Sequence, residues 1–91
     1  MASLRVACPH QQSEELARAA VESVARDLQD QLGASYAWEG AVLRVRATGA
    51  KGSIRVEPGE VVVEVDLGFA LLPFRNRIEE EVRSRLSTAL V

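Results

Sequence analysis

The residues best suited to chemistry are a cysteine and a histidine close to the N-terminus. Cys8 and His10 are the single residues of their types in the chain. If a strand continues through them, both side chains share one face, so a thiol–imidazole dyad is geometrically conceivable. Pro9 lies between them, however, and the sequence offers no obvious third group to orient the imidazole. A packed thiol beside a loop imidazole is the favoured interpretation, and we expect no catalytic residue and no enzyme activity.

The sequence also gives little support for a metal, cofactor or phosphate site. A zinc site needs about four nitrogen, sulfur or oxygen ligands at familiar spacing, which one cysteine and one histidine cannot supply. We therefore expect neither a metal site nor a cofactor. Gly49 and Gly52 bracket Lys51, as glycines do in phosphate-binding loops, but no helix N-terminus follows them. A tight turn is the favoured interpretation, and Trp38 is likewise expected to be a core or rim aromatic.

Length and composition limit what the chain can be. Its 91 residues, 47% of them hydrophobic and 26% charged, are typical of one globular domain, so we expect a single α+β domain over residues 1–91. The net charge of -2 does not favour binding to nucleic acid or to an anionic membrane. No apolar run reaches the length of a membrane-spanning helix, and the N-terminus lacks the features of a signal peptide. With one cysteine, the cytoplasm is the expected compartment.

The elements that must position these residues begin with two amphipathic helices. The first is predicted over residues 13–32, with Ser13 as N-cap and Gly33 after the last turn. Its apolar residues recur at spacings of three and four: Leu16, Ala17, Ala20, Val21, Val24, Leu28 and Leu32. The second is predicted over residues 73–89, with Pro73 as its first residue. Its apolar residues recur at every fourth position.

The remaining segments alternate apolar and polar residues, as half-buried strands do. Strands are predicted over residues 4–8, 36–39, 41–48, 53–57 and 61–67. Short turns join the last four, which makes them an antiparallel meander. The expected fold is a two-layer α+β sandwich of β-α-β-β-β-β-α order, with both helices on the aliphatic face of the sheet. The other face carries charged residues and would stay open or become a dimer surface.

One apolar segment is hard to bury completely in so small a domain. It runs from Leu67 to Phe74 and includes Phe69, Leu71, Leu72 and Phe74. A helix entry packed into the core is one interpretation. The alternative is an exposed patch used for dimerisation or for an apolar partner. These four residues are the candidate partner surface.

The order of several short motifs is similar to that of one small family. These are His10 before the first helix, Trp38-Glu39-Gly40, and Gly49-Ala50-Lys51-Gly52-Ser53-Ile54. The strand Val61-Val62-Val63-Glu64-Val65, the segment from Leu67 to Phe74, and Arg77-Ile78-Glu79 complete the pattern. Together they resemble the putative polyhydroxyalkanoic acid system proteins, also called the polyhydroxyalkanoate granule-region family. The resemblance implies a bacterial cytoplasmic protein associated with polyhydroxyalkanoate granules, and no established reaction.

Three hypotheses follow for the function. The first is a non-enzymatic interaction module of the polyhydroxyalkanoate system, with the granule or its proteins as partner. The second is a carrier or sensor of a small acyl ligand, which would need an interior cavity of roughly 300 Å³ or more. The third is a minimal enzyme that uses Cys8 and His10. A homodimer of structural role is compatible with all three.

Overall fold

The predicted order of elements is confirmed. The structure, a computed structural model, describes residues 3–90. Its elements are β1 (Leu4–Pro9), α1 (Glu14–Leu32), β2 (Ser35–Glu39), β3 (Val42–Ala47), β4 (Ala50–Glu57), β5 (Glu60–Leu67), the 3-10 helix η1 (Phe69–Phe74) and α2 (Arg75–Ala89). Ser13 caps α1 by accepting a hydrogen bond from the Leu16 backbone N–H, and Gly33 ends the helix in the left-handed conformation.

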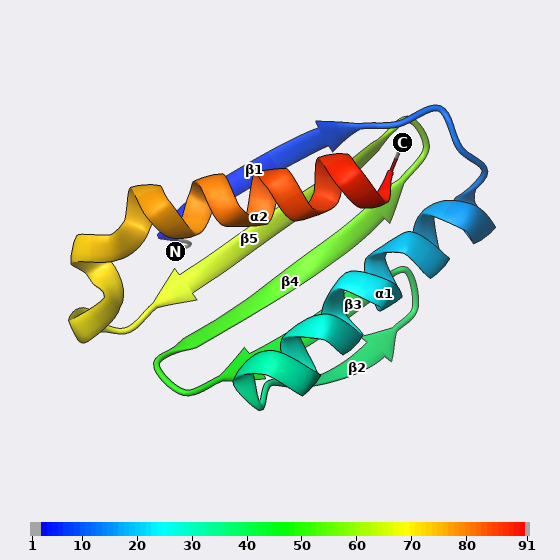
Figure 1. Cartoon of the computed structure of the whole chain (residues 1–91). Coiled ribbons are helices and arrows are strands. Elements are labelled where there is room, and N and C mark those ends of the chain that lie inside the picture. Colours follow the sequence, from blue (N-terminus) through cyan, green and yellow to red (C-terminus); the bar gives the residue numbers. More distant parts are fainter. Residues whose placement is uncertain (1–2, 91) are drawn as a thin grey trace.

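The strands form one five-stranded sheet in the order β1-β5-β4-β3-β2, and every neighbouring pair is antiparallel. Strands β2 to β5 follow one another as the predicted meander. Strand β1 occupies the edge beside β5, so α1 crosses from one edge of the sheet to the other (Figure 1). The turns at the strand ends are tight, and Gly49 in the β3–β4 turn has a φ of +81°, which favours glycine.

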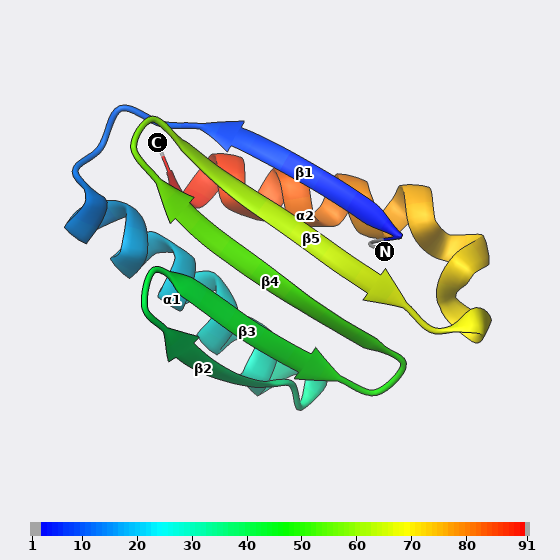
Figure 2. The ribbon, with the colours of Figure 1, turned by 180° about the vertical axis from the view of Figure 1, so that it is seen from behind.

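Both helices cover the same face of the sheet, as predicted (Figure 1). The aliphatic side chains of the strands meet those of the helices there, and the largest that are fully buried include Val6, Val21, Leu43, Val61 and Leu86. The view from behind shows the opposite face with no helix over it (Figure 2). This bare face and the ends of the sandwich are therefore free of helix cover.

Two of the seven apolar positions predicted to bury one side of α1 are wrong. Leu16 is 60% exposed and Leu32 is 68% exposed. Leu16 precedes the buried Val21 by five residues, which at about 100° per residue places it roughly 140° away around the helix. Leu32 is in phase with Val21, but it is the last residue of the helix, where few neighbours remain to cover it.

The entry to the second helix also differs from the prediction. Pro73 lies inside η1, and the α-helix begins only at Arg75. A 3-10 helix has about 3.0 residues per turn, so residues three apart lie on the same side. This periodicity decides which apolar residues of the segment turn outward.

Candidate functional site

The apolar segment after β5 is held in place by its glycine and one leucine. The Gly68 backbone N–H donates to the Gly49 carbonyl at 2.7 Å, which ties the segment to the β3–β4 turn. Leu71 is partly buried against the core, and its Cδ1 lies 3.1 Å from where a Cβ on Gly49 would stand. Leu71 therefore anchors the segment and does not belong to its exposed surface.

The other three candidate residues are exposed. Phe69 is 91% exposed, Phe74 53% and Leu72 43%. Phe69 and Leu72 are three residues apart in a 3-10 helix, which puts them on one side of it. We call Phe69, Leu72 and Phe74 the apolar corner. No other described stretch of the chain exposes three large apolar residues so close in sequence.

The bare face of the sheet carries charges of both signs around a broad hollow. The hollow has a volume of about 730 Å³ and is lined mainly by β2 to β5. Its charged residues are Arg44, Arg46, Lys51, Glu39, Glu64 and Asp66. A second hollow of about 470 Å³ adjoins it at the end of the sheet near Gly68. Neither lies between the helices and the sheet, so they give no support to an acyl ligand held in the core.

Some of these charges are already paired within the chain. Arg44 Nε lies 3.4 Å from a carboxylate oxygen of Glu39, and Arg55 contacts Glu57 at 3.6 Å and Glu64 at 3.7 Å. Val62, which points to this face between Ala7 and Arg55, is only 1% exposed because surrounding side chains enclose it. Side chains around β5 on this face are thus packed closely enough to bury a residue that the alternation of apolar and polar positions places at the surface.

His10 is a structural residue in this fold. The buried imidazole contacts two backbone groups: Nε2 is 3.0 Å from the Glu57 carbonyl, and Nδ1 accepts from the Gln12 N–H at 3.2 Å. These roles require the tautomer that is protonated on Nε2. The His10 backbone N–H donates to the Gly59 carbonyl as well, so the residue joins the β1–α1 loop to the β4–β5 turn.

The conceivable dyad of Cys8 and His10 is not formed. Both imidazole nitrogens are taken up by backbone groups, which leaves none to accept the thiol proton. The Cys8 thiol is buried, and within residues 3–90 its polar contact is a distant one to the Pro9 carbonyl. Among residues 3–90, no cluster of three or more His, Cys, Asp or Glu side chains is arranged to hold a metal ion.

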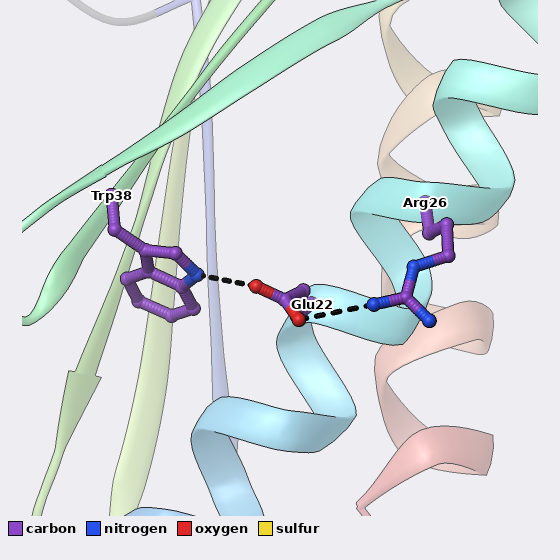
Figure 3. Close-up of polar contacts among 3 residues, drawn as sticks. All are labelled: Glu22, Arg26 and Trp38. Atoms are coloured by element: carbon purple, nitrogen blue, oxygen red, sulfur yellow. Dashed lines mark hydrogen bonds and ion pairs between the residues drawn. The ribbon is translucent and has the colours of Figure 1, made fainter.

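Trp38 joins α1 to the edge of the sheet at β2. Its indole N–H donates to one carboxylate oxygen of Glu22 at 2.9 Å, and Arg26 contacts the other at 3.1 Å (Figure 3). Arg18 stacks on the indole ring at 4.5 Å and donates to the Gly40 carbonyl. Trp38 is partly buried against the core, in agreement with the predicted core or rim position. Its polar network was not foreseen, because the partners lie on α1, a different element of the chain.

Among the described residues, one titratable group has a clearly shifted pKa, and it lies in the same network. A hydrogen bond to the Tyr36 side chain, together with charge interactions with Tyr36 and Glu22, raises the pKa of Arg26 above its ordinary value. A guanidinium is protonated at any physiological pH without this help. The shift therefore marks a structural contact and does not create a group that could transfer protons.

The arrangement of motifs along this fold matches a known family. The model of the putative polyhydroxyalkanoic acid system proteins matches residues 4–90. The chain belongs to this family. Neither a curated protein nor a solved structure matches it. In this polyhydroxyalkanoate-system protein, no helix of the described chain combines the length and apolar character needed to cross a membrane.

The features that carried the resemblance to polyhydroxyalkanoate-system proteins have separate places in the fold. His10 and Trp38 fasten loops and a helix to the sheet, and Gly49 forms a turn beside η1. Gly52 is needed because a Cβ there would lie 2.9 Å from the Glu64 carbonyl oxygen. These features maintain the fold. Phe69, by contrast, is a large apolar residue that is almost fully exposed and so contributes little to the core.

Proposed function

We propose that the chain is a non-enzymatic interaction module of the polyhydroxyalkanoate system that contacts granules through the apolar corner. The observation that carries this proposal is Phe69, which is 91% exposed on a segment anchored at both Gly68 and Leu71. Burial of a large exposed apolar side chain by a partner contributes about 1.5–3 kcal/mol to the free energy of binding. The proposal also assigns the protein to the bacterial cytoplasm.

The polar chemistry of the chain supports a binding role over a catalytic one. Cys8 is buried, and His10 is occupied on both nitrogens. At a net charge of -2, long-range attraction contributes little to the contact. Burial of apolar area is therefore the main term that would hold the protein on a granule.

The test is co-sedimentation of the purified protein with isolated polyhydroxyalkanoate granules. Phe69→Asp should weaken granule binding by about 10- to 100-fold, the equivalent of about 1.5–3 kcal/mol of lost apolar burial. Leu72→Asp should act in the same direction. Because Phe69 is so exposed, circular dichroism should show that the variant is folded.

Leu16→Asp is the matched control, because it makes the same kind of change at another exposed apolar residue, in the first turn of α1. It should bind granules like the unmodified protein. Equal binding by folded Phe69→Asp would refute the proposal. Equal loss in both variants would also contradict it, since adsorption would then not depend on the apolar corner. Repeating the assay with granules stripped of protein distinguishes contact with the polymer from contact with the protein coat.

A further inference from the structure

The bare face of the sheet has a charge pattern that is complementary to itself. The register aligns Arg46 on β3, Lys51 on β4 and Asp66 on β5 at one level of the sheet. At the next level whose side chains face outward, the register aligns Arg44, Ser53 and Glu64. At these levels the outward charges of β3 are thus cations and those of β5 are acids, with the cation Lys51 between them on β4.

At the first of these levels the charges have no partner within the described chain. Arg46 and Asp66 flank β4 and are separated by about 10 Å of sheet. Neither forms an ion pair or a hydrogen bond with another described residue. Asp66 Oδ1 is nevertheless buried and unpartnered, which is costly for a carboxylate oxygen. The other carboxylate oxygen, Oδ2, has no partner among the described residues either and is not buried, so it is the atom that a donor above the sheet could reach.

We propose that this face binds a second copy of the chain, with a two-fold axis that runs parallel to β4 between the two sheets. Such an axis places β3 of each copy over β5 of the other. Arg46 then lies opposite Asp66 of the second copy, and Arg44 lies opposite Glu64. Facing sheets pack about 10 Å apart, which an arginine side chain can span. Arg46 of each copy then supplies a donor to Oδ2 of Asp66 in the other.

The chemistry of the hollow favours a second copy over a small ion. Its three cations and three acids leave no excess of either charge. An anion would satisfy Arg46 and leave Asp66 unpartnered, and a cation would do the reverse. A copy of the same face provides both charges at once. Near the axis, Ser53 is small, and Arg55 is already turned aside toward Glu57 and Glu64. Lys51 also lies near the axis, and because its side chain is long and exposed it can extend toward the neighbouring Asp66 and away from Lys51 of the other copy.

A two-fold axis across the strands would be unfavourable, since it would lay β3 over β3 and bring Arg44 close to Arg46 of the other copy. The axis parallel to the strands has a further consequence, which rests on the proposed function. It directs both apolar corners toward the same end of the dimer, because η1 follows the end of β5 in each copy. Two corners at one end could contact one granule surface together, which strengthens binding through effective concentration.

The test is sedimentation equilibrium of the free protein, which involves no granule and is independent of the proposed function. The unmodified chain should dimerise. Arg46→Glu or Asp66→Arg alone should weaken dimerisation by at least about tenfold, since each places like charges opposite one another. The combined variant Arg46→Glu/Asp66→Arg should restore the dimer, because the exchanged charges again face each other.

Arg77→Glu is the control, since it makes the same charge change as Arg46→Glu at an exposed position of α2 that forms no ion pair with another described residue. It should leave the dimer intact. A chain that stays monomeric at its highest soluble concentration would overturn the proposal. So would a dimer that survives both single reversals, or one that the combined variant fails to restore. Phe69→Asp should still dimerise, which separates this outcome from failure of the granule contact.

Discussion

At the scale of single residues, the polar side chains of this protein mostly hold the fold together. Trp38 illustrates this, since one indole N–H, one stacked guanidinium and one carboxylate connect α1 to the β2 edge. An edge strand has a neighbour on one side alone, so such links replace part of the missing support. His10 does the same for the β1–α1 loop. A residue that supports a motif resemblance can therefore have a purely structural role.

Trp38→Phe tests the indole–carboxylate bond. The change keeps most of the ring but removes the N–H that donates to Glu22, so the free energy of unfolding should fall by about 1–2 kcal/mol. Glu22→Gln should cost less, because the amide oxygen can still accept from the indole. Urea unfolding measures both values. If Glu22→Gln proved the more damaging change, the ion pair with Arg26 and not the indole bond would be the important contact.

At the scale of elements, the junction of β5 and α2 decides what the protein presents to a partner. An uninterrupted α-helix from Pro73 would have left the preceding residues as a loop. The 3-10 helix instead turns Leu71 inward over Gly49 and turns Phe69 and Leu72 outward. The β3–β4 hairpin that supports Leu71 must itself be tightly packed, and Gly52 lies in its second strand.

Gly52→Ala tests that packing. The added Cβ would lie 2.9 Å from the Glu64 carbonyl oxygen and 3.3 Å from Val65 Cγ2, so β4 or β5 would have to shift. The free energy of unfolding should fall by about 1–3 kcal/mol. Ser53→Ala, at the next position and on the opposite face, should change it by no more than about 0.5 kcal/mol. Denaturant titrations of both variants measure the difference, and a Gly52→Ala protein as stable as the unmodified chain would contradict the tight packing.

At the scale of the whole molecule, the two helices leave one face of a five-stranded sheet without cover. Most outward residues of the strands thereby become surface, and that surface carries charges of both signs. The apolar corner lies at one end of the sandwich, beside the β3–β4 turn. A dimer through the bare face would therefore leave both corners accessible.

The dimer should make thermal stability depend on concentration. Folded chains associate and unfolded chains do not, so association stabilises the native state by mass action. Tm should therefore rise by several degrees over a roughly hundredfold increase in protein concentration. For Arg46→Glu, Tm should be nearly independent of concentration. Differential scanning calorimetry over such a series measures this. Because the paired charges are partly exposed, added salt should reduce the dependence, and a salt-insensitive rise would point to an apolar interface instead.

Much of the architecture could be predicted from the residues alone. Alternation along the strands, the three-and-four spacing of the helices and the cap at Ser13 are local properties, because each depends on neighbours within a few positions. Leu16 was misassigned because its apolar character was not weighed against its angle around the helix. The family was also recognisable from the order of short motifs, and its model matches residues 4–90.

The candidate sites depended on contacts that no local pattern contains. The exposure of Phe69 and the burial of Leu71 follow from a 3-10 turn docked against Gly49, about twenty residues away in sequence. The unpartnered Oδ1 of Asp66 depends on how three strands are aligned in the sheet. The hydrogen bond of His10 depends on the Glu57 carbonyl, which lies 47 residues further along the chain. The sequence by itself determined the elements and their apolar faces, because local sterics and periodicity govern these. Only the tertiary structure decided which residues face a partner, because burial is a property of chain segments brought together in space.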